Sequence, residues 1–206
     1  MKISSIELIQ FRNYDRFNTE LSPKLNWIYG SNGQGKTNLV ESIHYLSNLE
    51  SFRTKKISNI IQKNKSEALI NAIIERRNYK HNVYINVSKK GRQVFVDNNP
   101  SYHVSEYILS FMALAFTPES VGLFKSVPQE RRKFFNKIIS FFNPIYFKDL
   151  KEYKKIVLQK NASLRNGNID QIVIWNKMLA RSAKKLMEQR LEFVEQVNLY
   201  LHDLFI

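Results

Sequence analysis

The chain has 206 residues, with 32 Lys and Arg against 18 Asp and Glu, which gives a formal net charge of +14 at pH 7. With 43% hydrophobic residues, 14 Phe and 10 Tyr, the composition excludes a disordered chain and indicates a globular one. It contains no cysteine and no run of eighteen apolar residues, which excludes disulfides, thiolate zinc sites and a membrane-spanning helix. Glu7 lies where a signal peptide needs an apolar core, so we expect a cytoplasmic protein.

The first hundred residues have the pattern of β-strands. Apolar and polar side chains alternate over 3–11, as on a half-buried strand. The apolar segment 25–29 and the wholly apolar run 111–116 suit buried strands. Further strands are expected at 17–21, 68–75, 80–88 and 92–97, separated by Gly, Pro and Asn turns.

Beyond residue 117 the pattern changes to that of helices. Residues 117–120 are typical of a helix N-terminus, and 126–129 repeat this as a capping box before an apolar helical face. Two more helices are expected at 146–165 and from 169 to the end, where an apolar terminus without a cap suggests that the fold continues. We therefore predict a strand-rich domain, 1–118, and a helical domain, 119–206.

Three of the six glycines belong to a phosphate-binding loop, which matches the full pattern G-x-x-x-x-G-K-[ST]. Glycines let the backbone wrap a polyphosphate with its N–H groups pointing inward, and the following helix adds its positive end. Lys36 would reach the β- and γ-phosphates, and the Thr37 hydroxyl would bind Mg²⁺. An apolar segment precedes the loop and an amphipathic one follows it. The predicted nucleotide site comprises Gly30, Ser31, Asn32, Gly33, Gln34, Gly35, Lys36 and Thr37.

Hydrolysis of ATP needs, in addition, an acid at the end of a second buried strand. Asp97 follows an apolar run, but the turn at 98–100 makes it a hairpin residue. Glu119 is better placed, yet it reads equally as a first-turn acid of a helix. The sequence thus predicts phosphate binding without catalytic residues.

Five motifs in sequence order resemble the RecF recombination-mediator family over at least residues 3–165. They are Phe-Arg-Asn-Tyr at 11–14, the loop through Leu39 with Glu41, Ser-Phe-Arg-Thr at 51–54, Phe-Thr-Pro-Glu at 116–119 and Pro-Gln-Glu-Arg-Arg-Lys-Phe at 128–134. The resemblance implies a mixed α/β fold, namely an ABC-type ATPase lobe related to SMC and Rad50 heads with an inserted helical lobe. It also places Arg12 and Asn13 beside the bound nucleotide.

The resemblance further implies a role in DNA replication, recombinational repair and the SOS response to DNA damage. ATP and Mg²⁺ would drive homodimerisation on gapped or single-strand/double-strand junction DNA, where RecO- and RecR-type partners help to load recombinase; no membrane is involved. The family's later signature motif and Walker B strand are absent here, so the chain is expected to be an N-terminal portion or a natural truncation. Weak ATP hydrolysis is expected only from the complete dimer. Ser126 and Val127 replace the family's usual Gly-small pair.

Phosphate contacts should dominate any DNA binding, and basic residues concentrate in 51–66 and 125–160. The candidates are Arg131, Arg132 and Lys133, because adjacent arginines suit bidentate contacts; a merely solvated helix face is the alternative. No base-reading motif is present, which favours binding without sequence specificity. Two other functions stay open: a P-loop kinase or other nucleotide-metabolism enzyme, and a truncated basic interaction module that no longer depends on nucleotide.

Overall fold

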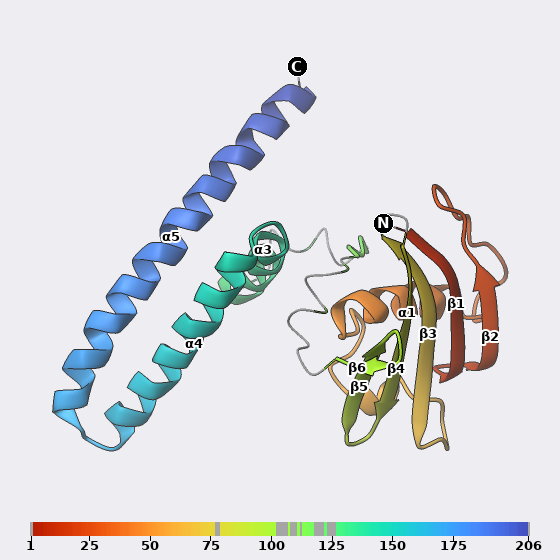
Figure 1. Ribbon diagram of the computed structural model, residues 1–206, viewed down its shortest axis with the longest axis horizontal. Coiled ribbons are helices and arrows are strands. Elements are labelled where there is room, and N and C mark those ends of the chain that lie inside the picture. Colours follow the sequence, from red (N-terminus) through yellow and green to blue (C-terminus); the bar gives the residue numbers. More distant parts are fainter. Residues whose placement is uncertain are drawn as a thin grey trace. The chain divides into compact units, whose positions relative to one another are not determined.

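The computed structural model describes residues 2–76, 79–101, 107, 111, 113–117, 122 and 127–205. The chain divides into two compact units, Met1–Thr117 and Pro118–Ile206 (Figure 1). This division falls one residue before the predicted boundary. The assignment of the units as an ATPase lobe and a helical lobe stays a prediction.

A six-stranded antiparallel sheet forms the first unit, with the strand order β2-β1-β3-β4-β5-β6. Its strands are β1 (Lys2–Phe11), β2 (Tyr14–Glu20), β3 (Glu67–Arg76), β4 (Tyr79–Ser88), β5 (Gly91–Val96) and β6 (Asn99–Pro100). Strands predicted at 3–11, 17–21, 68–75, 80–88 and 92–97 are confirmed, although β2 begins earlier, directly after the turn that follows β1.

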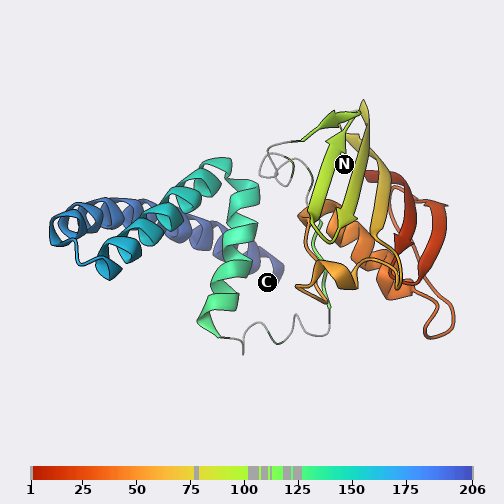
Figure 2. The ribbon, with the colours of Figure 1, turned by 90° about the horizontal axis from the view of Figure 1, so that it is seen from below.

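The core lies between one face of this sheet and helix α1 (Lys36–Asn48), which Figure 2 shows against the strands. Alternate residues of the strands are buried because strand side chains point to opposite faces in turn. On β3 the inward residues are Ala68, Ile70, Ala72 and Ile74, and α1 contributes Leu39, Tyr45 and Leu46. Burial of each large aliphatic side chain stabilises the unit by roughly 1.5–3 kcal/mol. This packing fixes α1, and with it the loop that precedes α1.

The strand predicted at 25–29 is wrong. The segment has no strand pairing, and Leu25, Trp27 and Tyr29 are 75%, 80% and 84% exposed. Apolar sequence supplies only the side chains of a buried strand, whereas a strand also needs a neighbour to pair with its backbone. The sheet of the described residues, which ends at β2 and β6, offers this segment no such neighbour.

The strand predicted at 111–116 is also not found: residues 111 and 113–117 are irregular, and 112 lies outside the described residues. Side chains of α1 hold this segment instead. Ser47 Oγ accepts a bond from Ala113 N (2.5 Å) and donates one to Phe111 O (3.1 Å), and Asn48 Nδ2 donates to Ala113 O (2.9 Å). These bonds satisfy backbone groups that a sheet would otherwise pair.

Asp97 is confirmed as a hairpin residue. It lies in the turn between β5 and β6 with φ of 51°, followed by Asn98 with φ of 65°. His81 Nδ1 donates a 2.7 Å bond to its carboxylate, and the Asn82 N–H donates another of 2.8 Å. These bonds hold the pKa of Asp97 below its usual value, so the carboxylate serves the hairpin. Glu119, the other candidate acid, lies outside the described residues.

The second unit consists of the predicted helices, α3 (Pro128–Phe142), α4 (Pro144–Arg165) and α5 (Ile169–Phe205). The capping box predicted at 126–129 is wrong, because Val127 is the N-cap of α3 and makes no side-chain cap bond; Ser126 lies outside the described residues. Proline at the first helical position explains the start, since it needs no N–H partner there. Of the helix start predicted at 117–120, Thr117 is irregular and the rest lies outside the described residues.

A partly buried polar cluster joins the three helices. Tyr146 Oη donates to Asn136 Oδ1 (2.5 Å), and Arg190 of α5 donates to both (2.9 and 3.0 Å). Asp149 accepts from Lys185 Nζ at 2.8 Å, a bond that raises the pKa of Lys185.

Within the part of the chain that the structure describes, no helix combines the length and apolarity needed to cross a membrane.

Candidate nucleotide site

The glycine-rich loop at 30–37 leads directly into α1, which begins at Lys36. Gly35 is the N-cap and has φ of 107°, a left-handed conformation that glycine adopts without strain. Its carbonyl accepts bonds from Asn38 N (2.7 Å) and Leu39 N (3.0 Å), which closes the first turn. The loop is therefore continuous with a helix N-terminus, where free N–H groups and the helix dipole favour anions.

The turn between β1 and β2 packs against this loop. Tyr14 Oη donates to Gly35 O (3.1 Å), and Asn13 Nδ2 donates to Gly33 O (3.4 Å). Asn13 Oδ1 also accepts a 2.7 Å bond from Asn38 Nδ2. Burial raises the pKa of Tyr14, which keeps its hydroxyl protonated as a donor. The Phe-Arg-Asn-Tyr motif thus supports the phosphate loop from a distant part of the sequence.

We expect Gly35→Ala to disrupt the loop more than Gly33→Ala. A Cβ at Gly35 would lie 2.9 Å from Asn13 Oδ1 and from the Tyr14 ring and hydroxyl, at a φ of +107°. A Cβ at Gly33 meets no atom within 4 Å and suffers only backbone strain at φ +84°, of roughly 1–2 kcal/mol. Urea unfolding of both variants should show the larger loss of stability for Gly35→Ala. ATP titration should show an affinity loss of at least about tenfold for the same variant. Equal effects would contradict the contact with Asn13 and Tyr14.

Lys36 folds its ammonium over the loop. Its Nζ donates to Gly30 O (2.7 Å) and Ser31 O (2.8 Å), two carbonyls of the loop that would surround a phosphate with its N–H groups. Thr37 follows in the first turn of α1 with an exposed side chain. The open space at Gly33, the Lys36 ammonium and the exposed Thr37 side chain fit a polyphosphate with its metal. Among the described residues no three His, Asp or Glu side chains form a metal cluster.

Glu41 is fully buried on α1 and joins three segments. Arg12 donates to it through Nε (2.9 Å) and Nη2 (2.5 Å), Ser51 Oγ donates at 2.5 Å, and Arg53 Nη1 lies 3.4 Å away. Arg53 Nη1 also donates to Asn38 Oδ1 at 2.7 Å. These residues belong to separate sequence motifs, and the sequence does not predict that they meet. The available signal was an acid on the inward face of α1, because a buried charge needs a partner.

Of the two predicted residues outside the loop 30–37, Asn13 contacts the loop at Gly33, whereas Arg12 bonds to Glu41 of α1 and to Asn59. All three guanidinium nitrogens of Arg12 are engaged, because Nη1 also donates to Asn59 O at 2.5 Å. The predicted DNA residues Arg131, Arg132 and Lys133 lie exposed in the first turns of α3, in the second unit. Whether any of these residues contacts nucleotide or DNA stays a prediction.

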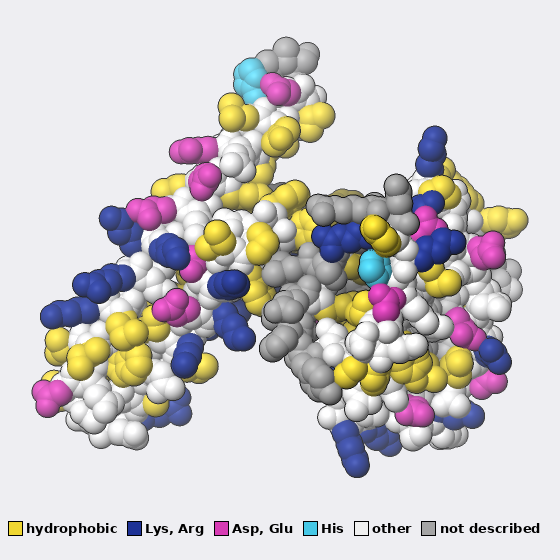
Figure 3. All heavy atoms as spheres, in the orientation of Figure 1, with side chains coloured by type: hydrophobic (Ala, Val, Ile, Leu, Met, Phe, Trp, Pro, Cys, Tyr) yellow, Lys and Arg dark blue, Asp and Glu magenta, His cyan; other side chains and the backbone are white. Residues whose placement is uncertain are grey.

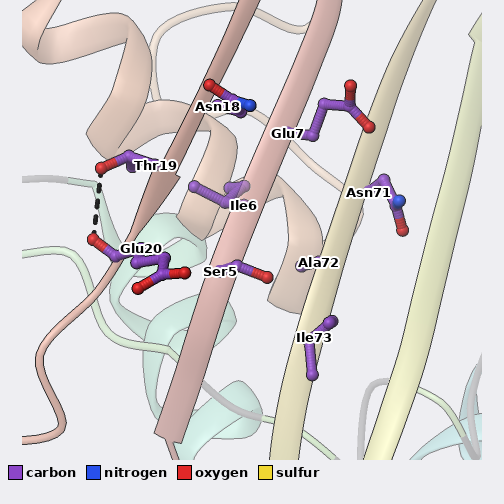
Figure 4. A pocket seen from close by; sticks show the side chains of 9 residues that line it. All are labelled: Ser5, Ile6, Glu7, Asn18, Thr19, Glu20, Asn71, Ala72 and Ile73. Carbon is purple, nitrogen blue, oxygen red and sulfur yellow. Dashed lines mark hydrogen bonds between the residues drawn. The ribbon is translucent and has the colours of Figure 1, made fainter.

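Another hollow, on the outer face of the sheet, does not suit a phosphate. It has a volume of about 410 Å³ and lies over β1, β2 and β3 (Figure 4). Glu7 and Glu20 line it, and Thr19 Oγ1 donates to the Glu20 carbonyl at 3.2 Å. Two carboxylates repel an anion, so the loop at 30–37 is the better nucleotide site.

A phosphate loop that caps a helix, supported by an antiparallel sheet, defines a P-loop nucleotide-binding domain of mixed α/β type. The chain matches the RecF/RecN/SMC N-terminal domain over residues 2–197 and belongs to that family. The family resemblance drawn from its motifs is thus confirmed.

The relatives include the DNA replication and repair proteins RecF of Clostridium botulinum (strain Loch Maree / Type A3) and Clostridium perfringens (strain 13 / Type A). Each is 32% identical over 203 residues, which are 97% of this chain and 56% of the relative. Two solved structures of the recombination mediator protein RecF in the RecFOR pathway, with ATPrS and with ATP, cover 94% of this chain. Their TM-scores are 0.83 and 0.87 at 28% and 27% identity. The chain spans about half the length of these relatives.

Proposed function

We propose that the chain is the nucleotide-binding N-terminal part of a RecF-type protein that acts on DNA in replication and recombinational repair. The observation that carries the proposal is the phosphate loop, with Lys36 bonded to Gly30 O and Ser31 O and Gly35 held by Tyr14. A RecF relative with ATP bound has a fold similar to that of this chain, which supports ATP as the nucleotide.

ATP would be held by the loop N–H groups, with Lys36 on its outer phosphates and Thr37 as a ligand of Mg²⁺. Mg²⁺ supplies charge neutralisation of the phosphates. The roles of this chain's own residues are to bind and orient: Asn13 lines the site beside Gly33, and Arg12 positions α1 through Glu41. Nucleotide binding is the role that we propose for this chain, and we propose weak ATP hydrolysis only for the complete dimeric protein.

DNA is the proposed macromolecular partner, bound without sequence specificity at gaps or single-strand/double-strand junctions. The charge of +14 supports a polyanionic partner, and Lys and Arg side chains are spread over the visible face of both units (Figure 3). We further propose that the helical unit is the inserted lobe of the ATPase head, that the protein is cytoplasmic, and that the complete protein forms ATP-dependent homodimers with RecO- and RecR-type partners.

Equilibrium binding to a fluorescent gapped duplex tests this function. We expect binding at low salt, with a higher affinity when ATP is present. The logarithm of the binding constant should fall linearly with the logarithm of the salt concentration. Arg132→Ala should lower that slope by about one, whereas the control Lys177→Ala, an exposed lysine on α5, should not. Absence of binding at low salt would contradict the DNA assignment. Binding that ignores ATP would favour the alternative of a basic interaction module.

A further inference from the structure

A second cleft in the first unit lies away from the phosphate loop and has a volume of about 440 Å³. Its walls come from two segments that are distant in sequence, the short helix Ile57–Asn59 with the loop after it and the turn that joins β4 to β5. The polar residues that line it are Ser58, Gln62, Lys63, Asn64, Lys65, Ser66 and Lys89. Folding therefore adds Lys89 to the lysines that sequence alone places in 51–66.

The cleft is cationic. Lys63, Lys65 and Lys89 are exposed, no Asp or Glu lines the cleft, and within the described ranges no ion pair involves these lysines. Glu67, the nearest acid in sequence, accepts a bond from Asn86 Nδ2 at 3.0 Å. Three like charges in one hollow repel one another, and a polyanion relieves that repulsion.

The loop that carries Lys63 and Lys65 is fixed to the rest of the unit. Ile60 O accepts from Arg12 N, and Gln62 N donates to Gln10 O, both at 2.8 Å. Asn59 O accepts from Arg12 Nη1, and Arg12 is in turn bound to Glu41. Backbone and side-chain bonds thus anchor the loop directly before its first lysine, which lowers the conformational entropy that binding would cost on this side of the cleft.

We propose that this cleft binds the phosphodiester backbone of duplex DNA. Lysines offer point charges that suit phosphates without a fixed geometry, and no aromatic side chain lines the cleft to stack on a base. The serine hydroxyls and the Asn64 amide add hydrogen-bond donors for phosphate oxygens. This contact is distinct from the predicted one on α3, and it rests on the proposed function for its DNA partner.

Charge reversal tests the cleft in the whole chain. The variant Lys63→Glu/Lys65→Glu/Lys89→Glu is compared with Lys24→Glu/Lys177→Glu/Lys184→Glu, which has the same net charge and changes exposed lysines outside the cleft. The probe is a fluorescent duplex in a salt titration. The cleft variant should bind at least about tenfold more weakly than the control variant, with a salt slope smaller than wild type by about three.

If wild type binds and the two variants have equal affinity and slope, the proposal that the cleft binds DNA is overturned, whereas the proposed function stands. No binding by wild type would overturn both. ATP titration provides the second readout. One ATP per chain, with equal affinity in wild type and cleft variant, is expected and shows that the variant is folded. A second ATP lost only in the cleft variant would assign the cleft to free nucleotide and overturn the proposal.

Discussion

Replacing Lys36 with alanine is expected to lower the affinity for ATP about 100-fold. The ammonium that now bonds to Gly30 O and Ser31 O is the one cation within the loop itself. Bonds to a charged group contribute roughly 1.5–3 kcal/mol each, so loss of its phosphate contacts accounts for an effect of this size. Equilibrium binding of fluorescent ATP to both proteins measures it.

The matched control is Lys24→Ala, which removes an exposed lysine outside the loop and should leave affinity unchanged. Circular dichroism should be the same for all three proteins, because Lys36 contributes no buried surface to the core. Equal ATP affinity in wild type and Lys36→Ala, or no binding in either, would contradict nucleotide binding at this loop.

Replacing Glu41 with alanine is expected to lower the free energy of unfolding of the first unit by about 3–5 kcal/mol. The Glu41 side chain is fully buried and the Arg12 side chain is 16% exposed, so the change would leave a guanidinium desolvated without its partner. Ser51 would lose its acceptor as well. Because Arg12 also holds the carbonyl of Asn59, the defect would spread from α1 to the loop beyond it.

Urea unfolding followed by fluorescence and circular dichroism measures this loss. Glu20→Ala, at an exposed acid on β2, is the control and should stay within about 0.5 kcal/mol of wild type. The double variant Arg12→Met/Glu41→Met should recover part of the loss, because it removes both charges together. A loss below about 1 kcal/mol in Glu41→Ala would show that the pair behaves as a surface ion pair.

The sequence predicts most elements of the fold because their signals are local. Alternation over 68–75 and 80–88 depends only on which face of the sheet is buried, and the Pro and Gly residues mark where helices begin and end. The strands predicted at 25–29 and 111–116 are wrong for the opposite reason. Each has the side chains of a buried strand, but pairing is decided by another part of the chain, which the local sequence does not reveal.

The candidate site also has one part that the local sequence predicts and another that it does not. The phosphate loop at 30–37 is contiguous, so its pattern is complete in the sequence and the structure keeps it before α1. The bonds from Arg12 and Ser51 to Glu41 join residues that are 29 and 10 positions apart. Nothing in the composition of three short motifs tells which acid pairs with which base. Only the folded chain brings them together.

The exposed segment ahead of the phosphate loop also affects how the protein behaves in solution. Leu25, Trp27 and Tyr29 present apolar surface to water, which favours self-association between molecules. The charge of +14 opposes this by mutual repulsion at low ionic strength. Salt at about 0.1 M confines that repulsion to about 10 Å and leaves apolar attraction intact. We therefore expect the molecules to stay dispersed in dilute buffer, where charge repulsion dominates. Concentrated sulfate should precipitate them, because it strengthens apolar association.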